Sequence, residues 1–207
     1  MRCLELFSGT KSVGKAIHDT YEVISVDICN KYKPTHNVDV LEWDYRQYPP
    51  DYFDAIWASP PCTEYSILKN NTGMNTNIDL ADSLVLRTFE ILDYFKPRRW
   101  YMENPQTSLL KTRAFMEGLS YFDVDSCRFS DWGYKKRTRI WTNVQFQDTL
   151  CEGEGVCPNM EGRFHKVSFG GQGRPKEHTY ATCPAGDTAY RVPEALIRAL
   201  FAAPILG

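Results

Sequence analysis

Several features that would place a chain in a special class are missing from this sequence. Its 207 residues contain no apolar run near the roughly 18 residues that a membrane span requires. The N-terminal stretch MRCLELFSG has neither the long apolar segment nor the small-residue cleavage site of a secretory signal. The seven cysteines are odd in number and scattered, unlike the cysteines of a secreted disulfide framework. We therefore expect an intracellular protein with reduced thiols and no membrane partner.

A net positive charge is also missing. The formal charge is −2 at pH 7, which argues against a generally basic surface for nucleic acid. The charge is unevenly distributed, however, because residues 135–176 contain eight lysines and arginines against four acidic residues. A basic region on an otherwise acidic chain is typical of a protein that binds a polyanion at one face. On charge alone, an ordinary solvated surface explains the pattern about equally well.

The chain does contain short apolar runs that alternate with segments of helical periodicity. Strands are expected at 2–9, 21–28, 36–44, 52–59 and 98–104, the third of them short and followed by a turn. Helices are expected at 11–21, 78–95, 108–119 and 193–203, and a loop at 69–77. Two further strands, 122–129 and 137–144, pair naturally in antiparallel fashion. This order predicts an α/β fold with a mostly parallel sheet and an antiparallel pair at one edge.

Residues able to carry chemistry follow four of the expected parallel strands. Gly9 follows the first strand, Asp27 the second, Cys62 the fourth and Glu103 the fifth. Ligands of open parallel sheets bind at the carboxyl ends of the strands. Each turn alone is more often an ordinary connection, but their convergence predicts one ligand site at this edge of the sheet.

The first two of these turns suit a cofactor. The segment ELFSGTKS brings backbone amides and hydroxyl groups to a helix start, where a carboxylate or another anion can bind. Asp27 could accept hydrogen bonds from a ribose, and Asp39 could accept one from an adenine amino group. Acids at strand ends are commonly just solvated, which is the alternative for both residues.

The third turn, in WASPPCTEYS, suits a nucleophile. Two prolines restrict the backbone immediately before Cys62, so the thiol is held at the tip of a strand. Glu103, in YMENP, could face the same cleft from the neighbouring strand. A thiol and a carboxyl group together suit attack on an electron-poor ring, with the acid supplying a proton. The alternative is a structural Cys62 in another nucleotide-binding α/β enzyme.

Five segments in order resemble the motifs of the DNA cytosine-5 methyltransferases: LELFSGTKSVGKA, ASPPCTEYS, YMENP, KKRTRIW and YRVPEALIRAL. The resemblance covers about 1–144 and 187–203. It implies a Rossmann-like, S-adenosylmethionine-dependent methyltransferase fold and methyl transfer from S-adenosylmethionine to C5 of cytosine in DNA. The residues that the resemblance implies at the cofactor are Phe7, Ser8, Gly9, Thr10, Ser12, Asp27, Ile28, Asp39, Val40, Ser59 and Pro61. Those that it implies in catalysis are Cys62, Glu103, Asn104, Arg137 and Arg139.

The resemblance also implies a role for each catalytic residue. Cys62 would add to C6 of a cytosine flipped out of duplex DNA, while Glu103 binds the exocyclic amine and N3. Asn104 would brace the Pro-Cys loop. Arg137 and Arg139 would hold the flipped nucleotide and help to keep Cys62 ionised. The same chemistry on RNA such as tRNA, and a catalytically weak relative that only binds, are the two alternatives.

The chain departs from the family pattern at several positions. Lys11 stands where the first motif has its second glycine, so its side chain either points away from the cofactor or pairs with the cofactor's carboxylate. Lys135 replaces the glutamine of the later motif, and YRVP replaces a Gly-Asn pair. We predict a catalytic domain at 1–144, a short insert at 145–186 in place of a large target-recognition domain, and a C-terminal helix at 187–207 that returns to the catalytic domain. Such a compact form is expected from a phage or large virus, acting inside the host cell.

The insert contains candidate metal ligands. Cys151, Cys157 and His165 are spaced C-x5-C-x7-H, and Cys127 lies at the far end of the expected hairpin. Four such ligands could form a tetrahedral zinc site that stabilises a segment without a core of its own. The spacing is wider than in common zinc fingers, and reduced cysteines in a loop are the alternative.

Overall fold

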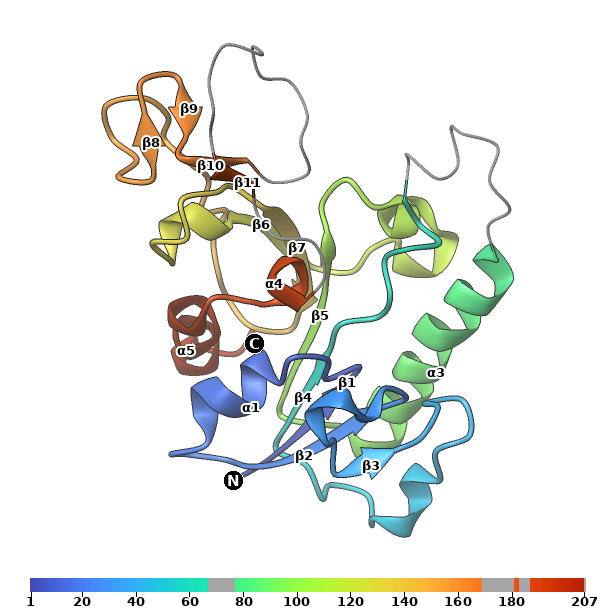
Figure 1. The fold of residues 1–207 in the computed structure, drawn as a ribbon. Coiled ribbons are helices and arrows are strands. Elements are labelled where there is room, and N and C mark those ends of the chain that lie inside the picture. Colours follow the sequence, from blue (N-terminus) through green and yellow to red (C-terminus); the bar gives the residue numbers. More distant parts are fainter. Residues whose placement is uncertain (67–76, 169–180, 183–186, 207) are drawn as a thin grey trace.

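The computed structural model describes residues 1–66, 77–168, 181–182 and 187–206. Its centre is a seven-stranded sheet with strand order β3-β2-β1-β4-β5-β7-β6 (Figure 1). The parallel strands are β1 (Arg2–Leu6), β2 (Glu22–Asp27), β3 (His36–Asn37), β4 (Ala55–Ala58) and β5 (Arg99–Pro105). The antiparallel strands β6 (Tyr121–Asp125) and β7 (Arg137–Thr142) form one edge. The predicted α/β fold, with its antiparallel edge pair, is therefore confirmed.

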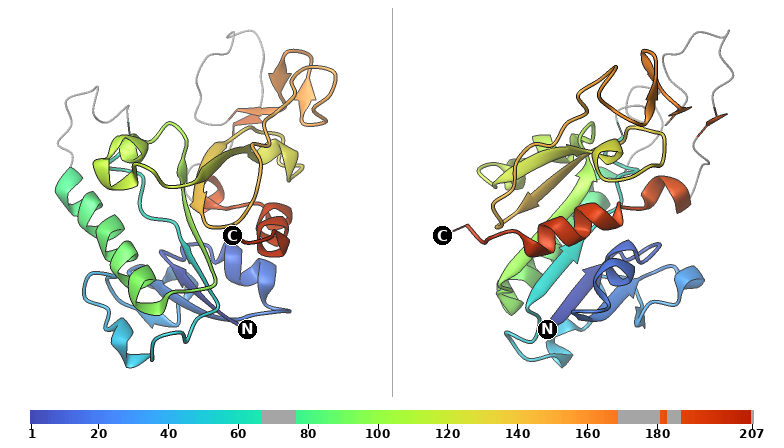
Figure 2. Two further views of the ribbon diagram at one scale, coloured as in Figure 1. Left: turned by 180° about the vertical axis from the view of Figure 1, so that it is seen from behind. Right: turned by 90° about the vertical axis from the view of Figure 1, so that its left-hand side faces the viewer.

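Helices cover both faces of this sheet, as Figures 1 and 2 show. The helices α1 (Ser12–Ile17) and α5 (Glu194–Ala202) pack together on one face, and α3 (Ile78–Phe95) covers the other. The alternation of β1 produces this division, because Cys3 packs in the cluster of α1 and α5 while Leu4 packs in the cluster of α3. Within the described part of the chain, no helix has the length and apolar character needed to cross a membrane.

Three of the expected helices differ in the structure. The first, expected at 11–21, is shorter, because α1 spans only Ser12–Ile17. The helix predicted at 108–119 is wrong, because two short 3-10 turns, η3 (Leu109–Thr112) and η4 (Ala114–Met116), occupy this stretch. Arg113 lies between them with an extended backbone and pairs with Asp82 on α3. The turns bury the side chains of Leu110 and Met116 without a continuous helix. In α5, Pro193 is the N-cap residue and not part of the first turn. The loop predicted at 69–77 lies, except for residue 77, outside the described residues.

Short elements connect the sheet strands and build the C-terminal third. They are η1 (Asn30–Tyr32), η2 (Tyr45–Gln47), η5 (Ser126–Arg128), β8 (Met160–Glu161), β9 (Phe164–His165), β10 (Val167–Ser168), β11 (Ala181–Thr182) and α4 (Asp187–Tyr190). In Figure 1 the strands β8 to β11 lie beyond the end of the β6–β7 pair. Among the described residues, none between 147 and 168 belongs to the three apolar core clusters. The domain boundaries at 144 and 186 stay predictions.

Candidate active site

A cavity of about 600 Å³ opens at the carboxyl ends of β1, β4 and β5. Four of the five predicted catalytic residues line it: Cys62, Glu103, Asn104 and Arg137. So do eight of the predicted cofactor residues: Phe7, Ser8, Gly9, Thr10, Ser12, Asp27, Ser59 and Pro61. The volume is within the usual range of about 300–1,000 Å³ for small-molecule sites. The strand ends thus meet at one site, as expected for an open parallel sheet.

The loop between β1 and α1 forms one wall of this cavity. Its backbone has positive φ angles at Phe7 (55°), Gly9 (41°) and Lys11 (56°). The backbone N–H of Gly9 donates to Asp27 Oδ2 at 2.7 Å, and Oδ1 of the same carboxylate accepts from Cys29 N at 2.7 Å. Asp27 therefore holds the loop in shape while its side chain lines the cavity. The hydroxyl of Ser8 is buried and has no hydrogen-bond partner among the described residues.

Glu5 also lines the cavity and was not singled out from the sequence. Its carboxylate oxygens accept hydrogen bonds from the backbone N–H groups of Val13 and Gly14, both at 3.1 Å. Burial raises the pKa of Glu5 from its ordinary value to about 7, although these amides and nearby lysines partly oppose the shift. Glu5 could have been identified from the sequence, because it is an acidic residue between two leucines of an apolar strand, in the segment LEL.

The Pro-Cys loop is tied to β5 by a side chain. The amide nitrogen of Asn104 donates to the carbonyl oxygen of Pro60 at 2.8 Å, which is the bracing contact expected of Asn104. Behind the loop, Trp57 Nε1 donates to Ser59 Oγ at 2.9 Å. The first bond connects the backbone before Cys62 to the neighbouring strand β5, and the second lies at the end of β4, the strand that leads into the loop. The sheet therefore helps to fix the position of the thiol.

Cys62, Glu103 and Lys136 form one cluster in the cavity lining, beside the further cationic residues Lys135 and Arg137. Lys136 Nζ lies 3.5 Å from Glu103 Oε1, and this oxygen is buried with no hydrogen-bond partner among the described residues. Burial and the Glu103 charge raise the pKa of the Cys62 thiol, whereas the Lys136 ammonium acts in the opposite direction. The cluster thus combines a nucleophile, a carboxyl group with unused hydrogen-bonding capacity and a cation. Lys136 was not a predicted catalytic residue; the basic run KKR in its motif was the available signal.

The two predicted arginines occupy different positions. Arg137 lines the cavity, and its guanidinium donates two hydrogen bonds to Asp125, at 2.9 and 2.8 Å. Arg139 is outside the lining, donates to both oxygens of Asp123 at 2.8 and 2.9 Å, and stacks on Tyr121 with its Cζ 3.7 Å from the ring centre. The nucleotide-holding role given to both arginines stays a prediction, which the geometry favours for Arg137.

Three predicted cofactor residues are not part of the cavity lining. Ile28 is 71% exposed, and Val40 is buried in the core cluster beneath α3. Asp39 accepts a hydrogen bond from Leu41 N at 2.9 Å and so shapes its own turn. The cofactor contacts proposed for these residues stay predictions.

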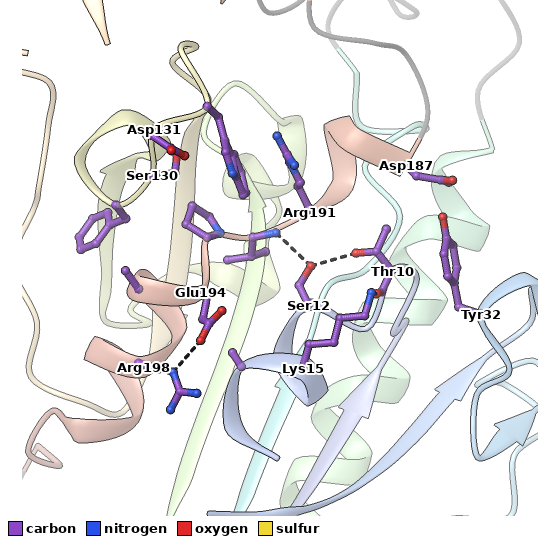
Figure 3. Close-up of a pocket in the computed structure, with 16 residues that line it drawn as sticks. Thr10, Ser12, Lys15, Tyr32, Ser130, Asp131, Asp187, Arg191, Glu194 and Arg198 are labelled. Carbon is purple, nitrogen blue, oxygen red and sulfur yellow. Dashed lines mark hydrogen bonds and ion pairs between the residues drawn. The ribbon is translucent and has the colours of Figure 1, made fainter. Parts of the chain in front are cut away.

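A second, more open hollow of about 730 Å³ adjoins the first (Figure 3). The two share the lining residues Thr10, Ser12, Tyr32, Asp187 and Val192. The side chains of Thr10 and Ser12 share a hydrogen bond of 2.9 Å, and Ser12 Oγ accepts from Val192 N at 3.3 Å (Figure 3). Asp187 pairs with Lys31 beyond Tyr32. The segment between α4 and α5, near the C-terminus of the chain, therefore packs against the β1–α1 loop.

Comparisons with known proteins show which family the chain belongs to. A family model described as C-5 cytosine-specific DNA methylase matches residues 1–146. A protein of Frog virus 3 (isolate Goorha), described as a probable DNA (cytosine-5)-methyltransferase, is 38% identical over 222 aligned positions. The alignment covers 95% of this chain and 97% of the viral relative. The chain belongs to the C-5 cytosine-specific DNA methylase family.

Solved structures share the fold of this methylase family member. A Spodoptera frugiperda DNMT2 variant superposes with a TM-score of 0.52 at 16% identity, covering 81% of this chain and 66% of that one. A prophage-encoded protein from E. coli, described as a putative DNA modification methyltransferase, gives a TM-score of 0.51 at 14% identity, covering 70% of this chain and 49% of that one. The chain thus spans about half the length of the prophage structure. The predicted Rossmann-like methyltransferase fold is confirmed.

Lys11, the residue that departs from the methylase motif, has an explanation in this structure. It is the N-cap residue of α1 and adopts the left-handed conformation that favours glycine. Its ammonium group donates to the carbonyl oxygen of Lys33 at 2.6 Å, and Lys11 is not among the residues that line the cavity. Of the two alternatives, the structure therefore has the side chain pointing away from the site. Lys135, at the position of the motif's glutamine, does line the cavity.

Proposed function

We propose that this methylase family member transfers a methyl group from S-adenosylmethionine to C5 of cytosine in DNA, through a covalent bond between Cys62 and C6 of the base. One observation carries the proposal. Cys62, Glu103 and Lys136 share a single cavity with the β1–α1 loop, where family members hold the methyl donor. A cytosine ring in this cavity would meet a nucleophile, a carboxyl group and a cation at once.

The residues present fit S-adenosylmethionine. This molecule combines a carboxylate, two positive charges and a nucleoside, and when bound it supplies an electrophilic methyl group. The buried hydroxyl of Ser8 lacks a hydrogen-bond partner within the described chain, and the carboxyl groups of Glu5 and Asp27 line the same wall. Two acids suit the cationic part of the ligand, and the loop amides suit its carboxylate. We expect Phe7 to Ser12 and Asp27 to form most of the binding surface.

The chain's own side chains then account for the reaction on the base. The Cys62 thiolate forms a bond to C6, and the electron pair displaced from the C5–C6 double bond makes C5 nucleophilic. Glu103 holds N3 and the exocyclic amine, so that negative charge does not accumulate on the ring. After C5 gains the methyl group, loss of its proton returns an electron pair to the ring and Cys62 departs. Asn104 keeps the Pro-Cys loop in place throughout.

In this proposal Lys136 helps to keep Cys62 ionised, a role that the family resemblance implies for Arg137 and Arg139. Its ammonium is the cation whose field lowers the pKa of Cys62 against the effects of burial and of Glu103. It also neutralises Glu103 until a base is present. Arg137, on the same wall, is positioned to meet a phosphate or the base carbonyl.

DNA is the favoured target, and RNA such as tRNA is the alternative. The family description and the name of the viral relative both refer to DNA. The basic composition of 135–176 suits either polymer. The viral relative also supports action inside an infected host cell. A flipped cytosine in a duplex is the substrate form that we propose, because C5 and C6 of a stacked base are out of reach of Cys62.

The decisive experiment uses oligonucleotides that contain 5-fluorocytosine. Fluorine at C5 cannot leave as a proton does, so a covalent enzyme–base adduct persists after methyl transfer. We expect the wild-type protein to form this adduct with duplex DNA and S-adenosylmethionine, as detected by intact mass. Cys62→Ser should form none, and Cys29→Ser, which removes an exposed thiol, should behave as wild type.

Other outcomes separate the alternatives. Methyl transfer from labelled donor to tRNA and not to duplex DNA would favour the RNA target. Donor binding with no transfer to either polymer would favour a relative that only binds. Full activity of Cys62→Ser would refute the covalent mechanism.

A further inference from the structure

A cluster of three cysteines and one histidine lies outside the candidate active site. It consists of Cys127 in η5, Cys151 and Cys157 in the segment after β7, and His165 in β9, and is called the Cys/His cluster below. Their four ligand atoms all lie within 4.8 Å of one another. Cys127 and Cys157 are buried, and in the part of the chain that the structure describes all three cysteines are free thiols. Residues up to 38 positions apart in the sequence thus converge on one point.

The two distances from the histidine of the cluster match a tetrahedral metal site. Nε2 of His165 lies 3.5 Å from Cys151 Sγ and 3.7 Å from Cys157 Sγ. Zinc bonds of about 2.3 Å to sulfur and about 2.0 Å to nitrogen, at tetrahedral angles, place these atoms about 3.5–3.8 Å apart. Three sulfurs and one imidazole are also a ligand set that zinc prefers. Four ligands from the protein would complete the coordination of such an ion and would leave no position for a reacting water.

The described chain around the Cys/His cluster has an ordered backbone, although none of its residues between 147 and 168 belongs to the three apolar core clusters. Asn159 is buried and donates to the carbonyl oxygens of Cys127 (2.9 Å) and Ser130 (2.8 Å), while its oxygen accepts from Gly133 N (2.9 Å). Cys157 N donates to Gly153 O at 3.0 Å, which closes the turn before it. These bonds orient the ligand-bearing loops, as outer contacts do around metal sites. A metal would supply the cohesion that an apolar cluster supplies elsewhere.

The cluster is next to the hairpin that carries Lys136. Ser126 precedes Cys127 in η5; its N–H donates to Lys136 O at 3.0 Å, and its Oγ accepts from Lys136 N at 2.8 Å. The same hydroxyl contacts Tyr134 O at 3.2 Å. Fixing Cys127 therefore fixes the backbone on both sides of Lys136, whose ammonium reaches Glu103 in the cavity.

We propose that the Cys/His cluster binds one structural zinc ion, which fastens the 150–165 segment to the β6–β7 hairpin and thereby holds Lys136 in the active-site cavity. The metal site itself does not depend on the proposed function. Its effect through Lys136 does, and the two parts are therefore tested by different measurements.

The first experiment measures metal in the full chain, purified without a histidine tag. We expect about one zinc ion per chain. Replacement of the zinc by cobalt(II) should give the intense visible absorption bands of a tetrahedral thiolate site. A chelator should lower the melting temperature by about 10 °C or more. Cys151→Ser and His165→Ala should lose most of the zinc, whereas the matched control Cys29→Ser should keep it. If the variants do not fold, the cobalt spectrum and chelation of the wild-type protein decide.

Three results would overturn the metal site. The first is that wild-type protein contains no zinc and that a chelator leaves its melting temperature unchanged. The second is a disulfide between cysteines of the cluster in the reduced preparation, and the third is that Cys151→Ser retains as much zinc as Cys29→Ser.

The second experiment tests the link to Lys136 by following alkylation of Cys62 against pH. In His165→Ala the apparent pKa of Cys62 should move upward, in the same direction as in Lys136→Met. An unchanged profile in zinc-free protein would refute the link while leaving the metal site intact. Neither zinc content nor alkylation of Cys62 requires methyl transfer to be measured, so failure of the proposed function can be distinguished from failure of this proposal.

Discussion

Lys136 Nζ and Glu103 Oε1 lie 3.5 Å apart, and both side chains are nearly buried, at 10% and 7% exposure. A buried ion pair offsets the cost of desolvating its charges only when its geometry is good and further hydrogen bonds are present. Here the Oε1 atom of Glu103 accepts no hydrogen bond from the described chain. The pair therefore has unused capacity at the place where a base would bind. It also adjoins the Cys62 thiol and sets the balance of charge around the nucleophile.

Replacing Lys136 with methionine should shift the pH dependence of methyl transfer. Without the ammonium, burial and Glu103 raise the pKa of Cys62 against a backbone hydrogen bond alone, so a smaller fraction is thiolate at neutral pH. Each unit of additional shift lowers kcat/KM at neutral pH about tenfold, and the profile moves to higher pH. Lys136→Arg should restore part of the activity, and Lys166→Met, at an exposed site outside the cavity, should not alter the profile. Equal loss at every pH would indicate a different role for Lys136.

Glu5 should make the protein less stable as the pH rises through the neutral range. Its pKa is about 7 in the folded chain and near its ordinary value in the unfolded chain, so between these values the folded state holds a proton that the unfolded state has lost. The free energy of unfolding then decreases with rising pH, by up to about 3 kcal/mol from this group. Glu5→Gln should remove that slope in denaturant titrations between about pH 5 and 7.5. A slope unchanged in Glu5→Gln would contradict the assignment.

The two arginines should separate in kinetic measurements. Arg137 lines the cavity and Arg139 does not, so Arg137→Gln should lower kcat/KM for the nucleic acid by a larger factor than Arg139→Gln. Arg139→Gln should act mainly on stability, by about 1–3 kcal/mol, because it leaves Asp123 without its charged partner. Asp123→Asn serves as the matched change on the other side of the pair. An equal loss of kcat/KM in both arginine variants would indicate that Arg139 also contacts the nucleic acid substrate.

The strand tips could be predicted from sequence, whereas the contacts between them could not. Gly9, Asp27, Cys62 and Glu103 each end an apolar run, and the rule for parallel sheets brings such ends together. Their mutual geometry depends on tertiary packing, which determines that Lys136 faces Glu103.

The ion pairs of Arg137 and Arg139 could have been predicted from the sequence. In the antiparallel register, Arg139 lies opposite Asp123 and Arg137 opposite Asp125. The patterns D-x-D and R-x-R on adjacent strands are those of cross-strand ion pairs. Residues 108–119 show the opposite error, since apolar spacing there predicted a helix where the backbone becomes extended at Arg113.

Replacing Lys11 with glycine restores the family motif and tests why lysine is tolerated there. Lys11 has φ 56° and ψ 42°, a conformation that costs most residues about 1–2 kcal/mol and glycine almost nothing. Relief of this strain is partly offset by the greater freedom of glycine in the unfolded chain, so Lys11→Gly should change stability by about 1 kcal/mol or less. Because the ammonium points to Lys33 O, affinity for S-adenosylmethionine in calorimetry should stay within about twofold. Lys11→Ala removes the same ammonium but keeps the strain, so it should match Lys11→Gly in affinity and be less stable. A tenfold loss of affinity in both variants would mean that the ammonium reaches the donor's carboxylate after all.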